Sequence, residues 1–171
     1  MTNDKKAIDL ITSAFDDYIS GRFLLSNNYS INGVILSSLA IEKYLKAMLL
    51  ILNGDFKKLH LDNIPKLIQA FDNTGYEVIF KYVDPRFLEL LSLGYKFRYY
   101  DNIKDKQTIG FATNQVIAEL DYFIAVLDQL VLLNIDGKPA VTQYRRAVNE
   151  NDPRIYDNNF FLNKIDKTIV R

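Results

Sequence analysis

The sequence lacks several residue types on which common protein chemistries depend. Among its 171 residues there is no cysteine, no tryptophan and only one histidine. Without cysteine the chain can form no disulfide framework, zinc–thiolate site, iron–sulfur cluster or thiol nucleophile. A single histidine excludes a histidine-rich metal centre, and it leaves His60 as the one residue that can supply imidazole chemistry.

Glycine is also sparse, and its placement excludes further classes of site. The seven glycines are scattered, so neither a P-loop nor a dinucleotide-binding fingerprint can be built from them. The sequence contains no Gly-x-Ser-x-Gly elbow, and its Asp, Glu and His residues show no metal-ligand spacing. We therefore expect neither a cofactor nor a metal ion.

Long apolar runs and an excess of one charge are missing as well. The most apolar stretch, residues 47–52, is far shorter than the roughly 20 residues that a membrane-spanning helix needs. No signal peptide is visible, so we expect a cytoplasmic bacterial protein with no membrane contact. The 21 basic side chains balance 21 acidic ones, so any nucleic-acid site has to be a local basic patch.

What the sequence does contain is helical periodicity. Residues 3–27 place their apolar side chains on one stripe, which predicts a helix with one buried face. Residues 30–52 are apolar nearly all round, apart from a narrow strip that holds Ser38, Glu42, Lys43 and Lys46. A helix of this kind is normally the most buried one of its domain.

Three further helices are predicted downstream. A short one follows Asp62 or Asn63, a second begins after the Asp84 cap and runs to about residue 97, and a long one covers about 111–133. Residues 76–83 we interpret as a loop or a helical turn. The predicted fold class is all-α, an antiparallel up-and-down bundle of four to five helices over residues 1–137.

The remaining residues, 138–171, differ from the bundle. They hold seven Lys or Arg against four Asp or Glu, together with several aromatic and aliphatic residues. Such a segment is too apolar to be a free disordered tail. We expect this C-terminal arm to dock on its own bundle or on a neighbouring subunit.

Three polar features stand out as candidate site elements, each with a structural alternative. Glu42 and Lys46 are four residues apart, which suits either an intrahelical ion pair or, with Lys43, the wall of an anion-binding cleft. His60, in a loop, could pack or cap, or it could contact a ligand. Residues 95–101 mix aromatic and basic side chains, which can stack a base and hold a phosphate, or simply fasten a helix end.

Read together, these stretches resemble the HEPN family, small helical domains of prokaryotes and higher eukaryotes that are linked to nucleotide and RNA biology. The sequence AIEKYLKA at 40–47 is similar to the family's A-x-E-K-x-L-K-A helix, and HLDNIPKL at 60–67 is similar to its loop histidine and short helix. YKFRYYD at 95–101 resembles the family's Y-x-x-R-Y-P-D, with Tyr100 in place of proline. The resemblance covers about residues 4–135.

The resemblance implies a helical bundle that is commonly dimeric. Many family members are metal-independent ribonucleases, and others pair with a small nucleotidyltransferase in toxin–antitoxin modules. The ribonucleases share an arginine followed, after four to six residues, by a histidine. Here the residues at those distances from Arg98 are Ile103, Lys104 and Asp105, and no arginine stands at the matching distance before His60. Ribonuclease activity by that mechanism is therefore not expected.

The leading hypothesis is a non-catalytic HEPN-like domain that binds a nucleotide, RNA or a protein partner as a homodimer. Its expected functional face consists of six residues, Lys43, Lys46, His60, Tyr95, Arg98 and Asp101. In this hypothesis the lysines and the arginine hold phosphate, Tyr95 stacks on a base, and Asp101 orients Arg98. Two alternatives are a divergent ribonuclease that uses His60 and Arg98, and an adaptor whose arm embraces a partner chain.

Overall fold

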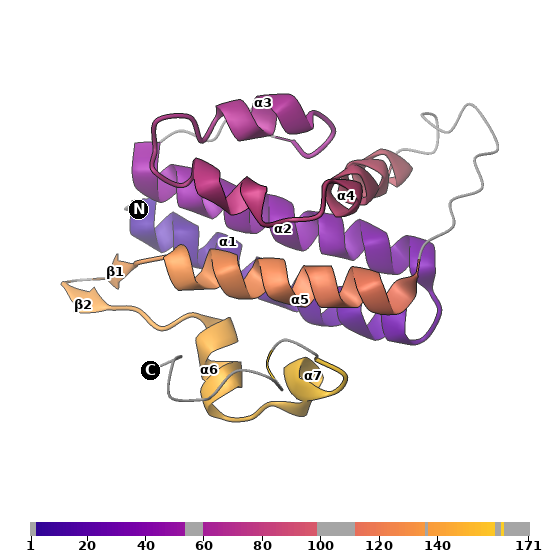
Figure 1. Cartoon of the computed structure of the whole chain (residues 1–171). Helices are drawn as coiled ribbons and strands as arrows, with labels where there is room; N and C mark the ends of the chain where they lie inside the picture. The colour runs from indigo at the N-terminus through magenta and orange to yellow at the C-terminus, as the bar shows by residue number, and fades with distance from the viewer. Residues whose placement is uncertain (1–2, 54–59, 99–111, 136, 160–161, 163–171) are drawn as a thin grey trace.

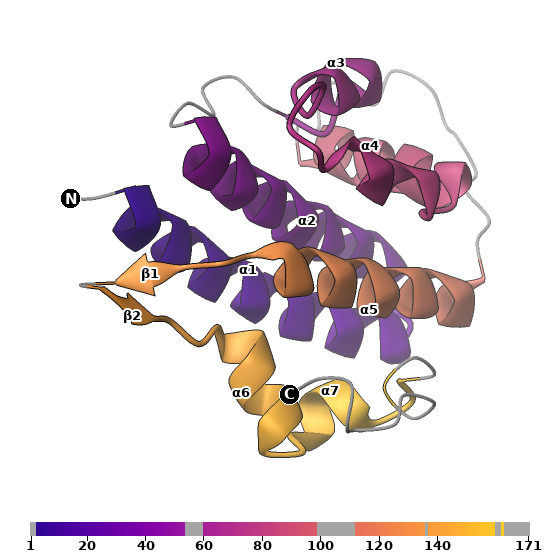
Figure 2. The same ribbon diagram turned by 60° about the vertical axis from the view of Figure 1, so that its left-hand side comes forward.

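The protein is an all-α bundle with a C-terminal arm, as the sequence predicts. A computed structural model describes residues 3–53, 60–98, 112–135, 137–159 and 162. The long helices α1 (Asn3–Ser26), α2 (Ser30–Asn53) and α5 (Thr113–Leu130) lie side by side, and α1 runs opposite to the other two (Figure 1). Shorter helices cover the bundle on opposite sides (Figure 2).

Helices α1 and α2 form a tight hairpin. Asn28 turns the chain in the left-handed conformation, with a φ of 65°, which asparagine tolerates better than most residues. Gly33 lies so close to α1 that an added Cβ would stand 2.6 Å from Leu25 Cγ. The two helices therefore pack nearly backbone to backbone at this end of the bundle.

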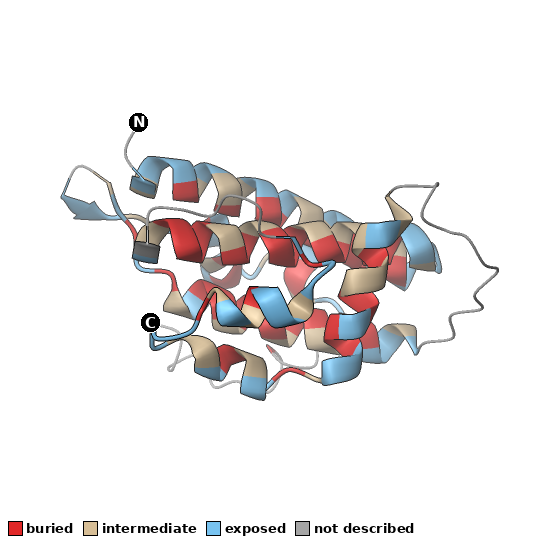
Figure 3. Ribbon diagram, turned by 90° about the horizontal axis from the view of Figure 1, so that it is seen from above, coloured by how far each residue is buried: buried red, intermediate tan, exposed pale blue. Residues whose placement is uncertain are grey.

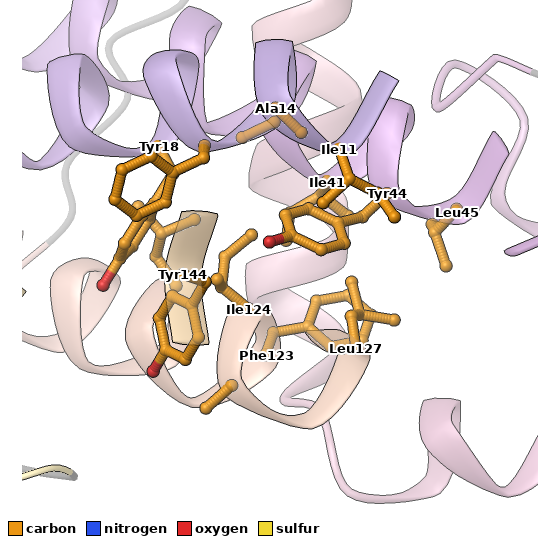
Figure 4. Packing of buried hydrophobic residues seen from close by; sticks show 14 of the residues in the cluster. Ile11, Ala14, Tyr18, Ile41, Tyr44, Leu45, Phe123, Ile124, Leu127 and Tyr144 are labelled. Atoms are coloured by element: carbon orange, nitrogen blue, oxygen red, sulfur yellow. The ribbon is translucent and has the colours of Figure 1, made fainter. Parts of the chain in front are cut away.

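Helix α2 is the central helix, which confirms the expectation from its apolar composition. Seen from above, buried residues run along almost its whole length, whereas the exposed residues of α1 lie along one side (Figure 3). The core joins α1, α2 and α5, with Tyr18, Tyr44 and Phe123 among its largest fully buried side chains (Figure 4). Burial of large aromatic groups of this kind dominates core energetics.

Helices α3 (Ile64–Gln69) and α4 (Pro85–Phe97) cover α2 on one side, and a 3₁₀ turn, η1 (Glu77–Lys81), connects them (Figure 1). This turn confirms the helical-turn interpretation of residues 76–83. Each helix starts as its sequence predicts, with an Asn63 or Asp84 side chain accepting a backbone N–H bond and a proline in the first turn.

Helix α4 crosses α2 at small residues. In Figure 1 α4 is seen nearly end-on, whereas α2 is seen lengthwise. A Cβ added at Gly94 would stand 2.9 Å from the carbonyl oxygen of Val34, and the Ser38 hydroxyl donates a hydrogen bond to the Leu91 carbonyl at 2.9 Å. Because no side chain separates the two backbones here, the end of α4 is brought close to α2.

The described part of the arm is folded and packs on its own bundle. A small antiparallel hairpin, β1 (Asn134–Ile135) and β2 (Lys138–Pro139), leads into α6 (Gln143–Asn149) and α7 (Pro153–Tyr156). Both helices lie on the side of the bundle away from α3 and α4 (Figure 2). Of the two expected docking places, the described arm residues take the intramolecular one.

Two buried aspartates on α5 hold this arm. The first, Asp121, accepts hydrogen bonds from Tyr18 Oη at 2.7 Å and from Arg22 Nε at 2.6 Å. The Arg22 guanidinium also donates to the backbone carbonyls of Arg154 and Asp157, at 2.7 and 2.9 Å. Arg22 thus joins α1, α5 and the region of α7 in one polar network.

The second, Asp128, repeats this arrangement two turns further along α5. It accepts hydrogen bonds from Tyr44 Oη at 3.1 Å and from Thr142 Oγ1 at 3.0 Å. The guanidinium of Arg145 lies 3.1 Å from the same carboxylate and also donates to the Asp128 carbonyl at 2.6 Å. Thr142 caps α6, so this aspartate fixes the place where the arm becomes helical.

Burial changes the acidity of these groups. Loss of solvent raises the pKa of both aspartates, although the neighbouring arginines and hydrogen-bond donors oppose this. The pKa values of Tyr18, Tyr44 and Tyr144 are raised by burial first and by the adjacent carboxylates second. The phenols therefore stay protonated in the folded protein well into the alkaline range.

Candidate functional site

Helix α2 carries the predicted site residue Lys46 and its ion-pair partner Glu42 near its middle. Lys46 Nζ lies 2.7 Å from Glu42 Oε1, and the two side chains are one helical turn apart. Glu42 is 8 % exposed and Lys46 17 % exposed, so the pair is largely shielded from water. The predicted intrahelical ion pair is present, and its carboxylate has further partners outside the helix.

The segment before α3 brings His60 to this carboxylate. The imidazole Nδ1 lies 3.4 Å from Glu42 Oε1, and the backbone N–H of Leu61 donates to Glu42 Oε2, also at 3.4 Å. Leu61 is fully buried, whereas the His60 side chain is 43 % exposed. The buried leucine thus anchors the chain, and the histidine next to it stays open to solvent.

The end of α4 supplies an aromatic ring and a second cation. The ring centroids of His60 and Tyr95 are 5.3 Å apart with an interplanar angle of 43°, and Arg98 Cζ lies 4.2 Å from the Tyr95 centroid. The latter distance is typical of a cation–π contact. One tyrosine ring therefore holds both an imidazole and a guanidinium beside it.

We call these five residues the α2–α4 cluster, after the two helices that carry most of them; they are Glu42, Lys46, His60, Tyr95 and Arg98. Its formation follows from the close crossing at Gly94, because Tyr95 is the next residue along α4. On the other side of the cluster, the Asn63 cap fixes where the chain turns from His60 into α3.

The cluster combines side chains whose chemistry suits contacts with phosphate and with an aromatic ring. Lys46 and Arg98 are cations that can bind phosphate oxygens, and Arg98 can do so in a bidentate manner. His60 offers an exposed ring that can stack on a base or exchange a proton. Glu42 restrains both Lys46 and His60, so their positions are set before any ligand arrives.

The other two predicted residues are not brought to the cluster. Lys43 points to α1, where its Nζ lies 2.6 Å from Asp17 Oδ2 and 2.7 Å from Ser13 Oγ. Asp101 lies outside the described residues, so its expected contact with Arg98 stays a prediction. The structure therefore separates the two lysines of one strip of α2 into different environments.

Sequence reasoning missed the connection between Glu42 and His60. The ion pair with Lys46 follows from helical spacing, but residues 18 positions apart across a loop meet only through tertiary packing. The sequence signal that could predict this contact is the apolar Leu61 next to His60. When Leu61 is buried, the backbone is held at this point, and the position of the His60 side chain is restricted.

The described residues hold no group of three or more acidic or histidine side chains that could bind a metal ion. Among these residues no helix has the length and apolarity that spanning a membrane requires. A cavity of about 670 Å³ lies between the end of α1 and α7, lined by residues such as Phe23 and Arg154.

Comparisons with known proteins add no assignment. The chain matches no family model, no curated protein and no solved structure.

Proposed function

We propose that the α2–α4 cluster binds a phosphate-bearing nucleotide ligand, either a free nucleotide or single-stranded RNA, in a HEPN-like domain that lacks the family's ribonuclease pair. The observation that carries this proposal is the meeting of His60, from the segment before α3, with Tyr95 and Arg98 at the end of α4. The resemblance of the sequence to HEPN motifs supports the same ligand class.

In the proposed complex Arg98 and Lys46 bind the phosphate, and the base stacks on the exposed His60 ring, which Tyr95 supports from behind. Stacking of a base on an aromatic side chain contributes about 1–3 kcal/mol and tolerates different bases. The expected ligand is consequently recognised by charge and stacking more than by base sequence.

Fluorescence anisotropy with a labelled oligoadenylate and with labelled AMP tests this proposal. Arg98→Ala removes the phosphate contact and should weaken binding at least about tenfold, as expected for a charge-assisted hydrogen bond. The matched control is Arg86→Ala, an exposed arginine near the start of the same helix. Negligible or equal binding by wild type and Arg98→Ala would remove the proposal.

A second candidate function is a divergent, metal-independent ribonuclease. The observation in its favour is that His60 and Arg98 contact the same tyrosine ring while Glu42 lies at the imidazole Nδ1. With Nδ1–H donated to Glu42, Nε2 could take the proton of a ribose 2′-hydroxyl while Arg98 holds the phosphate. The 2′-oxygen would then bond to phosphorus as the P–O5′ bond breaks, and the leaving 5′-oxygen would take a proton from water. Cleavage of labelled RNA in the presence of EDTA, lost in His60→Gln, would establish this activity; intact RNA would exclude it.

The resemblance also motivates proposals about assembly. We propose a cytoplasmic homodimer, and a nucleotidyltransferase as a further partner in a toxin–antitoxin or defence-type system. Light scattering measures the oligomeric state directly, because the chain mass is 19.8 kDa and a dimer has twice that mass. The remaining alternative is a homo-oligomeric adaptor that binds no ligand. In that case the anisotropy experiment would show no binding of the oligoadenylate or of AMP.

A further inference from the structure

The last turns of α1 carry an exposed aromatic ring on a surface that is poor in charge. Exposed charged side chains occur on this helix as far as Asp16, but between residues 18 and 26 the single charged residue is Arg22, which is buried. Phe23, in contrast, is 64 % exposed. Depletion of charge together with an aromatic side chain is typical of the centre of a protein interface. This end of α1 is therefore suited to contact with another protein.

A hollow lies directly beside Phe23. Helix α7 packs on α1, and the cavity of about 670 Å³ between them is lined by Ile19, Phe23 and Leu24 on the α1 side and by Pro153 and Arg154 on the α7 side. We call this cavity the α1–α7 groove. An apolar cavity of about 150 Å³ is large enough for benzene, so the groove has room for a phenyl ring and its neighbours.

We propose that the α1–α7 groove is the contact surface between two copies of this chain, with Phe23 of each copy seated in the groove of the other. The inference rests on the homodimer part of the proposed function, and it goes further by naming the surface. In a two-fold contact the same residues meet from both sides, so the surface has to supply both a projecting group and a hollow that receives it. The last turns of α1 and the groove supply these two parts side by side.

The charges on the α7 side of the groove are self-complementary. Arg154 and Asp157 both line the groove, and both are exposed. Nε and Nη2 of Arg154 donate to Asp152, and because a guanidinium has five N–H donors, its third nitrogen can pair with a second carboxylate. A surface of one sign would repel its own copy, whereas a two-fold contact can place Arg154 of each copy opposite Asp157 of the other.

The size of the groove predicts a weak dimer. Ten described residues line it, whereas a standard protein interface has about 20–30 residues on each side. Interfaces below the standard size belong to transient complexes. We therefore expect monomer and dimer to exchange, with a dissociation constant in the micromolar range.

Sedimentation velocity of the full chain between about 1 μM and about 1 mM tests the proposal. The mass should rise from 19.8 kDa toward twice that value across this range. Phe23→Ser should weaken the dimer at least about tenfold, as expected for an aromatic side chain at the centre of an interface. The matched control is Tyr82→Ser, which removes a ring that is 67 % exposed before α4 and should leave the equilibrium unchanged.

A charge exchange tests the two-fold pairing. Arg154→Glu and Asp157→Arg each place like charges across the contact, so each should abolish the dimer. The double variant Arg154→Glu/Asp157→Arg restores opposite charges and should recover it. Circular dichroism of each variant checks that it is folded, and the comparison of Phe23→Ser with Tyr82→Ser tests the surface even if a charge variant does not fold.

The outcomes separate this inference from the proposed function. A chain that stays monomeric at about 1 mM overturns the inference together with the homodimer part of the proposed function, and it leaves only a different protein as the occupant of the groove. A wild-type dimer that Phe23→Ser does not weaken overturns this surface alone, because the copies then meet elsewhere. A folded double variant that stays monomeric overturns the pairing of Arg154 with Asp157. Ligand binding by the α2–α4 cluster is measured independently of all three results.

Discussion

Arg22 and Asp121 are 99 positions apart and form a two-pronged ion pair in the interior. Arg22 Nε lies 2.6 Å from Asp121 Oδ1, and Arg22 Nη2 lies 2.9 Å from Oδ2. Asp121 has no exposed surface, and Arg22 is 4 % exposed. Removing both charges from water is costly, so a pair of this kind persists only when both partners are present and further hydrogen bonds satisfy them.

Asp121→Asn should therefore destabilise the protein by about 3–5 kcal/mol, because it leaves the Arg22 guanidinium buried without its counter-charge. Urea unfolding followed by circular dichroism measures the difference. The control is Asp9→Asn, an exposed aspartate on α1, which should change the free energy of unfolding by less than about 0.5 kcal/mol. Similar stability of the two variants would contradict the structural role of the pair.

Deleting residues 138–171 should unfold the bundle, not merely change its oligomeric state. The described part of the arm supplies buried side chains, among them Tyr144 and Ile155, and two carbonyl acceptors for Arg22. Each large apolar side chain contributes about 1.5–3 kcal/mol on burial, and a domain has only about 5–15 kcal/mol of stability. A truncated chain that still unfolds cooperatively, with only a changed mass by light scattering, would support the adaptor alternative instead.

The buried tyrosines predict how the protein responds to alkaline pH. Their folded-state pKa values are raised above the unfolded value of about 10, so the folded state binds more protons there. By linkage, the free energy of unfolding is unaffected below pH 10 and falls as the pH rises above it. In an alkaline titration, tyrosinate absorbance should show a step above pH 10 that coincides with the loss of helical circular dichroism. Tyr44→Phe should reduce the amplitude of that step.

The two lysines of α2 should differ in ligand binding. Lys46→Met removes a cation from the cluster and should weaken oligoadenylate binding about tenfold or more. Lys43→Met removes the same charge from a lysine that pairs with Asp17 on α1, and it should leave the affinity nearly unchanged. Anisotropy at two salt concentrations checks this, since a shallower salt dependence is expected only for Lys46→Met.

Gly94→Ala tests the crossing that builds the cluster. The added methyl group would meet the Val34 backbone at 2.9 Å, so α4 has to move away from α2. Overpacking of this kind costs about 1–3 kcal/mol, and the shift should also separate Tyr95 from His60. We expect lower stability and weaker ligand binding together. Ser92→Ala, on the same helix, is the control that should retain both.

Much of the bundle could be predicted from local signals. The start of α4 follows from Asp84 and Pro85, and the all-round apolar pattern of residues 30–52 correctly identifies the central helix. The helices of the arm were not predicted, because α6 and α7 are short and their stability comes from contacts with α1 and α5. The roles of Arg22, Asp121 and Asp128 were missed for the same reason, since charged residues on amphipathic helices usually face solvent.

Whether the predicted residues lie near one another depends on tertiary contacts. The residue types of Lys46, His60, Tyr95 and Arg98 predict a ligand site. In the fold these four residues are linked by contacts, Lys46 and His60 through Glu42, and His60 and Arg98 through Tyr95. The position of Lys43 on the same polar strip of α2 as Lys46 predicts a shared site, yet Lys43 faces α1 and pairs with Asp17, whereas Lys46 pairs with Glu42. Sequence spacing does not reveal which neighbour each lysine meets.

The small residues at the crossing of α2 and α4 have a consequence for how this chain tolerates change. Ser38 and Gly94 contact no ligand in the proposed complex, yet the distance between the two helices depends on them. In a library of random variants selected only for ligand capture, we expect larger side chains to be eliminated at these two positions as strictly as changes at Arg98. The neighbouring Lys96, which is exposed, should accept almost any residue.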